Sequence, residues 1–274
     1  MRLFVSADIE GVVGVVARDQ GRPAGFEYEQ ARTWMTDGVL AVCSAAREAG
    51  ATEVIVADSH GHGYNIQLER MPDYVQLVRS WPRPLGMMQG IEIGKYAGAL
   101  LIGYHAGSTN PGGVLSHTLS SDLFQEICLN GEFASEAAIS VAIAGHFGVP
   151  VIMVAGDDVF VEEARVLLGD VSSATVKTAY GTSSALNPSI AVATTRLSEA
   201  TRAGIAAASQ RQPQRIQGPV TMDLRLRTRS VAEWLGYLPG VERTGAFSVR
   251  YRADDIIAVS RFLMFVTFAR SSLG

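Results

Sequence analysis

Acidic and histidine side chains follow apolar segments of this sequence at the points where those segments end. The stretch RLFVSAD runs into Asp8 and Glu10, EVIVADSH ends in Asp58 and His60, and GALLIGYHA ends around His105. In an extended segment, residues two apart point to the same side. We therefore expect the two side chains of each pair to face the same way.

Imidazoles together with several carboxylates form a ligand set for zinc or a similar divalent metal. Carboxylates placed this densely would repel one another, and a bound cation removes that cost. The donors outnumber what one tetrahedral zinc ion needs, so a dinuclear site with one bridging carboxylate fits their number better. Sites of that kind usually perform hydrolysis.

Each of these residues also has a structural interpretation when it is taken alone. Asp8 is a common type of turn or cap residue, and His105 reads equally well as a buried, hydrogen-bonded histidine. We expect residues 156–158 to cap the segment that follows them, His62 to be solvated in a loop, and His146 to be structural. For Asp8 and His105, the shared position at strand ends favours the metal site.

The elements that must position these side chains read as an alternation of strands and helices. Buried parallel strands are expected at residues 2–8, 53–60, 98–106 and 149–158. Helices are expected over residues 28–46 and over residues 135–146, the second with Ser135 as its N-cap. This alternation predicts an α/β fold, a three-layer α/β/α arrangement around a mainly parallel, mixed sheet. Ligand sites of such sheets gather at the carboxyl ends of the strands, so the polar groups should converge on one crevice.

The later part of the chain departs from this alternation. The Asn130-Gly131 pair predicts a β-hairpin and a local antiparallel excursion. Further segments follow, namely a helix near 196–210, half-buried strands at 220–228 and 245–253, and a closing helix at 254–270. We expect a single α/β domain over residues 1–274 with a C-terminal strand–helix extension. Any subdivision would fall near 205–218, with the C-terminal part in oligomer contacts.

The composition is that of an ordinary globular protein. Of the 274 residues, 47% are hydrophobic and 18% are charged, and the net charge is −4. This balance argues against nucleic acid and anionic membrane surfaces as partners. The start of the chain does not read as a secretory signal, and the apolar run at 262–269 is too short to cross a bilayer. Cys43 and Cys128 lack metal-site spacing, so we expect free thiols and a cytoplasmic location.

Several short motifs occur in a characteristic order along the chain. They are SADIEG, DSHG, GYHAG, GGVLSHT, NGEFASE and VPVIMVAGDD. In this order and at these intervals they resemble the DppA-type zinc D-aminopeptidases. The resemblance continues through YLPGVERTG and the closing helix, so it covers essentially the whole chain.

The resemblance implies a dinuclear site with two zinc ions per chain. The family's S-x-D-x-E-G motif falls on residues 6–11, which implies that Asp8 and Glu10 are metal ligands and that Asp8 is the bridge. The family's D-S-H and G-Y-H motifs imply that His60 and His105 are ligands as well.

One further ligand has two candidates. The family has another glutamate at a helix start shortly after the hairpin asparagine. Spacing from Asn130 and the position after Ser135 favour Glu136, and Glu132 is the rival because it also follows the turn. The family's catalytic histidine lies in a Gly-rich loop that ends in Ser-His, and it corresponds to His117. Its role stays open between general acid/base and oxyanion stabiliser.

The implied function is that of a metal-dependent aminopeptidase that hydrolyses short peptides from the N-terminus by a metal-activated water, with a preference for D-residues. One alternative is a dinuclear hydrolase of an L-peptide or another small amide. A phosphoester hydrolase is less favoured, because no basic residues cluster beside the proposed ligands in the sequence. A non-catalytic peptide-binding transport component would have no use for convergent metal ligands.

The resemblance also implies a ring-like homo-oligomer, with a decamer as one candidate size. Such a ring would enclose the active sites and restrict access to short peptides. Trp234 and Tyr237 are candidate subunit contacts, although core packing explains them equally well.

Overall fold

The chain folds around two β-sheets, which the computed structural model describes over residues 1–273, with side chains to residue 269. The main sheet has seven strands in the order β3-β2-β1-β4-β7-β8-β9. Its strands are β1 Arg2–Ala7, β2 Glu53–Asp58, β3 Val75–Val78, β4 Gly98–Tyr104, β7 Val151–Asp157, β8 Ser172–Gly181 and β9 Ser184–Leu186. All neighbours are parallel except β8 and β9, which are antiparallel.

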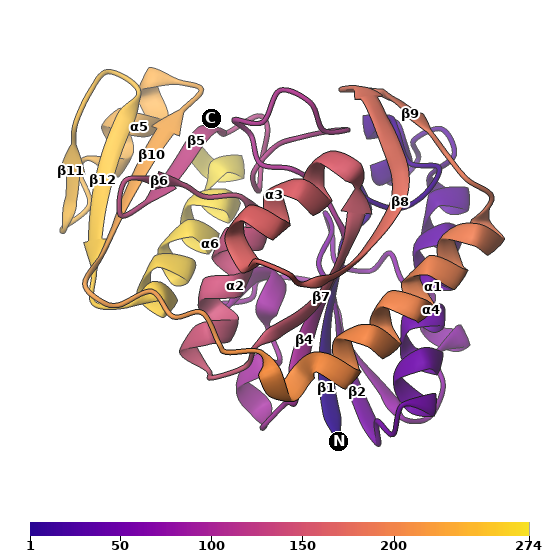
Figure 1. Ribbon diagram of the computed structural model, residues 1–274. Coiled ribbons are helices and arrows are strands. Elements are labelled where there is room, and N and C mark those ends of the chain that lie inside the picture. The colour runs from indigo at the N-terminus through magenta and orange to yellow at the C-terminus, as the bar shows by residue number, and fades with distance from the viewer. Residues whose placement is uncertain (274) are drawn as a thin grey trace.

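Helices cover both faces of the main sheet (Figure 1). They are α1 Tyr28–Glu48, α2 Glu136–His146, α3 Asp158–Leu168 and α4 Ile190–Ala207. Apolar side chains of α1 and α4 share one core with alternate residues of β1, β2 and β4, while α2 and α3 pack into the core on the opposite face. The expected three-layer α/β/α arrangement with a mixed, mainly parallel sheet is confirmed.

The second sheet is antiparallel and has five strands in the order β11-β12-β10-β5-β6. They are β5 Phe124–Leu129, β6 Glu132–Phe133, β10 Val220–Leu226, β11 Val241–Arg243 and β12 Ser248–Ala253, accompanied by α5 Arg229–Leu235 and α6 Ile256–Leu273. The hairpin at Asn130-Gly131 forms as expected. However, it is not an isolated antiparallel pair, because it belongs to this second sheet. Its strand β5 pairs with β10, so the C-terminal extension takes two strands from the middle of the chain (Figure 1).

The strands predicted from apolar runs are present, and four others were missed, of which β11 has only three residues. β3 is only four residues long, β9 only three, and β8 carries many polar residues, so none of these strands reads as an apolar run. Short 3₁₀ turns lie at Arg18–Gly21, Leu68–Arg70, Gly86–Met88, Ile91–Ile93 and Ala208–Gln210.

Residues 211–219 lead towards β10 without regular secondary structure. The treatment of the chain as a single domain stays a prediction. No helix within the described residues is both long enough and apolar enough to span a membrane.

Candidate metal centre

Three neighbouring strands place the loops that follow them side by side. β1 lies between β2 and β4, and Ala7 near its end pairs with Asp58 of β2 and with Ile102 of β4. Because the three strands are parallel, they end at the same edge of the sheet. The loops that carry the predicted ligands leave from that edge, where the sequence predicted a crevice.

The loop after β1 passes very close to the end of β4. Gly11 donates its backbone N–H to Gly103 O at 2.7 Å, and a Cβ at Gly11 would lie 1.9 Å from Tyr104 O. A side chain at Gly11 would therefore push the loop away from the sheet edge. This close approach fixes the position of Glu10, the residue before the glycine.

His60 faces both carboxylates of the N-terminal motif. Its Nε2–H donates to Gly21 O at 2.7 Å, which leaves Nδ1 without a proton in the neutral ring. Nδ1 lies 3.2 Å from Asp8 Oδ1 and 2.9 Å from Glu10 Oε2. Glu10 Oε2 is buried and has no well-aligned hydrogen bond among the described residues.

His105 repeats this arrangement on the other side of Asp8. Its Nδ1–H donates to Ala106 O at 3.0 Å, and its Nε2 lies 3.5 Å from Asp8 Oδ2 and 3.4 Å from Glu136 Oε1. Nε2 is buried and finds no hydrogen-bond partner among the described residues. The two oxygens of Asp8 therefore face two different histidines.

The charge distribution of this cluster is unfavourable unless protons or cations neutralise it. Bare ring nitrogens and carboxylate oxygens are all acceptors, so they repel one another. Burial raises the pKa of Asp8 to about 8, and the charges of Glu10 and Glu136 add to that rise. Burial alone would lower the pKa of His105, but the nearby Glu136 outweighs it and raises that pKa to about 10. The cluster thus holds protons that a divalent cation would replace.

The donor atoms fit a dinuclear metal site. Three groups each offer ligand atoms within 4.8 Å of one another: Asp8, Glu10 and His60; Asp8, His105 and Glu136; and Glu10, His105 and His117. Asp8, Glu10 and His105 each belong to two of these groups. Histidines that bind metals usually donate their second ring N–H to a carbonyl or carboxylate group, as His60 and His105 do here. The residues therefore fit a divalent ion such as zinc.

Glu136 lies in the cluster, and Glu132 does not. Glu136 is the first residue of α2, where the helix N-terminus favours a carboxylate, and Ser135 caps the helix by accepting from Ala138 N at 3.3 Å. Glu136 Oε1 also accepts from the backbone N–H of Leu119 at 2.7 Å. Glu132 is an exposed residue of β6 and lines a different cavity.

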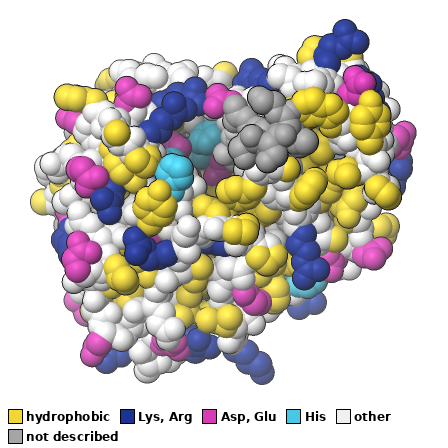
Figure 2. All heavy atoms as spheres, turned by 180° about the vertical axis from the view of Figure 1, so that it is seen from behind, with side chains coloured by type: hydrophobic (Ala, Val, Ile, Leu, Met, Phe, Trp, Pro, Cys, Tyr) yellow, Lys and Arg dark blue, Asp and Glu magenta, His cyan; other side chains and the backbone are white. Residues whose placement is uncertain are grey.

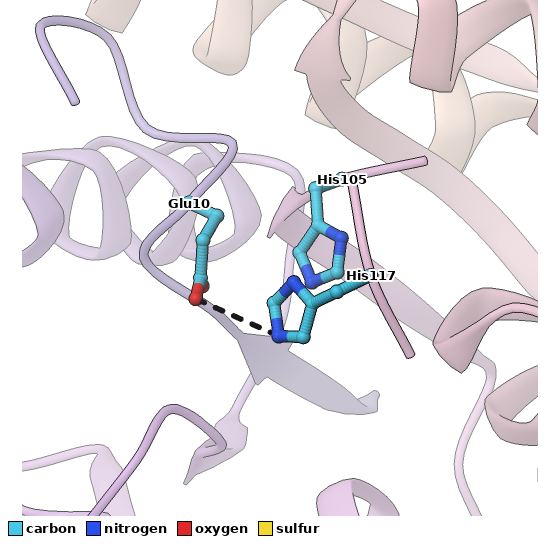
Figure 3. A group of neighbouring side chains, drawn as sticks. All are labelled: Glu10, His105 and His117. Atoms are coloured by element: carbon cyan, nitrogen blue, oxygen red, sulfur yellow. Dashed lines mark ion pairs between the residues drawn. The ribbon is translucent and has the colours of Figure 1, made fainter. Parts of the chain in front are cut away.

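The ring of His117 lies beside that of His105, and a dashed line joins it to Glu10 (Figure 3). The two rings stack with centroids 4.2 Å apart. His117 Nδ1–H donates to Leu115 O at 2.8 Å, so Nε2 faces Glu10 Oε1 at 3.9 Å and Glu136 Oε1 at 3.7 Å. Burial and then the charge of His105 lower the pKa of His117, which keeps its Nε2 unprotonated.

The other polar residues noted in the sequence lie outside the cluster. Asp58 accepts from the backbone N–H groups of Asn65 and Ile66 at 2.5 and 2.7 Å, so it builds the loop after β2. Asp157 caps α3, as expected, and also accepts from Val114 N at 2.8 Å. His62 is exposed and stacks on Tyr64, while His146 is the last residue of α2, remote from Glu136 at its start.

Comparison with known proteins agrees with this geometry. The family profile of the D-aminopeptidases matches residues 1–265. The chain belongs to the D-aminopeptidase family. A curated D-aminopeptidase of Bacillus subtilis (strain 168) is 30% identical over 268 residues, which is 97% of each chain.

A solved structure extends the likeness to the whole fold. The zinc-dependent D-aminopeptidase DppA from Bacillus subtilis, described as a self-compartmentalizing protease, superposes with a TM-score of 0.93 at 29% identity. The match covers 98% of this chain and 97% of that one. The family and the peptidase class expected from the sequence motifs are therefore confirmed.

One residue that contacts the candidate site in this D-aminopeptidase family member was missed in the sequence. Lys177 of β8 is buried, and its ammonium group donates to the carbonyl oxygens of Glu10, Val12 and Val15 at 2.5, 3.0 and 2.5 Å. It thereby holds the loop that carries Glu10. Burial lowers its pKa to about 8. The sequence carried no signal for this lysine, because it falls out of phase with the buried Ala174 and Val176.

An open cleft of about 720 Å³ lies next to the cluster. Its lining includes Glu10, His60 and His117 together with Arg18 and Arg22. Figure 2 shows a hollow on this face of the molecule. Histidine and acidic side chains lie inside the hollow, and basic side chains lie at its rim. The expectation that no basic residues cluster beside the proposed ligands is wrong for the cleft, because Arg18 and Arg22 are part of its lining. Arg18 and Arg22 follow Glu10 later in the sequence, but the loop after β1 folds back, so that all three residues line the same cleft.

Proposed function

We propose that this chain is a zinc-dependent aminopeptidase with two zinc ions per chain, which hydrolyses short peptides from their N-terminus and prefers D-residues. Membership of the D-aminopeptidase family supports the reaction, and the related structure named as zinc-dependent supports the metal. The peptide-binding transport alternative has no such support.

The observation that carries the proposal is the placement of Asp8. Its Oδ1 lies 3.2 Å from His60 Nδ1 and its Oδ2 lies 3.5 Å from His105 Nε2. A carboxylate with its two oxygens directed at two histidines is suited to bridge two metal ions. We assign Glu10 and His60 to one ion and His105 and Glu136 to the other, with Asp8 shared.

Zinc, when bound, supplies Lewis acidity that lowers the pKa of a water molecule towards neutrality and polarises a carbonyl group. The protein must then manage the protons and the substrate. Peptide hydrolysis releases an amine that needs a proton. His117 is placed for this role because its Nδ1–H is held by Leu115 O and its Nε2 is free to accept a proton and pass it on. An oxyanion-stabilising role for the same ring would require Nε2 to be protonated.

The assembly and its location are also proposals. The related DppA is called self-compartmentalizing, and we infer that this chain forms a ring-like homo-oligomer, with a decamer as the size to test. Tyr237 is 72% exposed and Trp234 is 37% exposed, so both are available for subunit contacts. Cys43 and Cys128 are free thiols, which is consistent with a cytoplasmic location. Native mass spectrometry tests the subunit number, and cell fractionation tests the location.

The substrate class is tested by a panel of substrates with the zinc-loaded protein. D-Ala and L-Ala at the N-terminus of otherwise identical tripeptides give the stereochemical preference, and p-nitrophenyl phosphate tests a phosphoester activity. We expect release of D-alanine at the highest rate. Cleavage of the L-peptide alone would keep the metal mechanism and reject the D-preference, whereas phosphate release alone would reject the aminopeptidase.

A further inference from the structure

The cleft beside the metal centre has a cationic side chain that the proposed reaction does not yet use. We propose that Arg22 binds the C-terminal carboxylate of the substrate, so that this enzyme cleaves a short peptide with a free C-terminus faster than the corresponding C-terminal amide. This inference rests on the proposed aminopeptidase function and extends it from a reaction to a substrate class.

The backbone next to Arg22 touches the metal centre. Arg22 follows Gly21, whose carbonyl oxygen accepts from His60 Nε2 at 2.7 Å. A Cβ at Gly21 would lie only 3.0 Å from the same nitrogen. The arginine is therefore attached to the residue that orients a proposed ligand, and it lines the cleft that His60 and His117 also line.

The loop that carries Arg22 is held in one shape by a buried glutamine. The Gln20 side chain accepts from Val16 N at 2.7 Å and from Ala17 N at 2.9 Å, and it donates to Gly14 O at 3.0 Å. The backbone of Arg22 continues this order by donating to Asp19 O at 3.2 Å. A fixed loop presents its side chains to a ligand at a lower entropic cost than a mobile one.

The guanidinium of Arg22 is available for a ligand. Arg18, the other arginine of the cleft, donates to Ser121 Oγ at 2.9 Å and pairs with Asp122 at 3.3 Å. The Arg22 side chain is exposed and makes no hydrogen bond or ion pair with any atom of residues 1–269. Arginine suits a carboxylate because its planar fork can donate two parallel hydrogen bonds.

The size of the cleft agrees with a short peptide. A volume of about 720 Å³ lies within the usual range of small-ligand sites, and an extended peptide advances roughly 3.5 Å per residue. With the scissile bond at the metal centre, the proposal places a carboxylate one or two residues further on at Arg22, which lines the same cleft. An amidated or longer peptide would not place a negative charge there.

The test compares D-Ala-D-Ala with its C-terminal amide, using the zinc-loaded, full-length protein. The variants are Arg22→Gln, Arg22→Lys and the control Arg215→Gln, an exposed arginine beside Gly148, which follows the C-terminal end of α2. For the wild type we expect kcat/KM to be about tenfold higher on the acid than on the amide, the scale of a charge-assisted hydrogen bond at an exposed site.

Arg22→Gln should remove this difference, mainly by raising KM for the acid, and should leave hydrolysis of the amide unchanged. Arg22→Lys should keep part of the preference, and Arg215→Gln should keep all of it. Equal wild-type rates on both substrates, or an equal loss on both in Arg22→Gln, would overturn the inference and leave the aminopeptidase intact. A zinc-loaded wild type that releases D-alanine from neither substrate would overturn the proposed function and this inference with it.

Discussion

The rings of His105 and His117 stack with their planes 5° from parallel, yet they differ in access to the cleft. The His105 side chain is 1% exposed and that of His117 is 19% exposed. Both rings turn Nδ1 to a backbone carbonyl and Nε2 to the acidic cluster. His105 is thus the inner ring, suited to bind metal, and His117 is the outer ring, suited to meet the substrate.

This difference predicts the result of removing the outer ring. His117→Ala should lower kcat by roughly a hundred- to ten-thousand-fold, the usual contribution of a positioned acid or base, and should keep its zinc. Steady-state kinetics and zinc analysis on the same sample check both parts. Loss of zinc along with activity would place His117 among the ligands.

The two glutamates near the hairpin provide a matched pair. Glu136 lies 3.4 Å from His105 Nε2, while Glu132 is exposed on β6. Glu136→Gln should weaken zinc binding about tenfold or more, because the substitution replaces a negatively charged metal ligand with a neutral amide. Glu132→Gln should leave the zinc affinity unchanged. Competition with a chromophoric chelator measures both affinities. The opposite ranking of the two affinities would show that Glu132, and not Glu136, is the zinc ligand.

Lys177 should stabilise the loop that carries Glu10. Lys177→Met leaves the carbonyl groups of Glu10, Val12 and Val15 without their buried donor, which should lower the free energy of unfolding by about 1–3 kcal/mol and weaken zinc binding. The exposed Lys95 offers the control, since Lys95→Met should change neither quantity. Denaturant unfolding of the metal-free protein and zinc titration separate the two effects. Unchanged zinc affinity in Lys177→Met would limit this lysine to a role in stability.

Two helical glycines should respond in opposite ways to alanine. A Cβ at Gly38 in α1 would meet Leu197 Cδ1 at 3.4 Å, an acceptable contact at the edge of a small apolar cavity. A Cβ at Gly145 in α2 would lie 1.8 Å from Gln214 O. Gly38→Ala should therefore raise the free energy of unfolding by about 0.5–1 kcal/mol, and Gly145→Ala should lower it. Thermal unfolding of both variants decides whether this packing is correct.

Much of the main sheet could be predicted because its signals are local. The apolar runs that became β1, β2, β4 and β7 each end in polar residues, and Ser135 caps α2 as its position suggested. The convergence of Asp8, His60 and His105 followed from the rule that parallel strands end at one edge. Their detailed roles came from the family resemblance and remain proposals.

The features that could not be predicted depend on contacts between distant parts of the chain. The pairing of β5 with β10 joins segments about ninety residues apart, as the bond from Thr221 N to Asn130 Oδ1 shows, with a sequence separation of 91. Lys177 reaches Glu10 across a separation of 167 residues. Arg22 lies beside His60 only because the loop after β1 folds back. Neither periodicity nor motif spacing reports such contacts.

A zinc titration of the metal-free protein tests the dinuclear centre, with bound zinc per chain and release of D-alanine from D-Ala-D-Ala measured on the same samples. We expect binding to saturate at two zinc ions per chain, activity to rise with zinc occupancy, and Asp8→Asn to lose both zinc binding and activity. Full activity in the metal-free protein, or unchanged zinc binding in Asp8→Asn, would contradict a dinuclear centre bridged by Asp8.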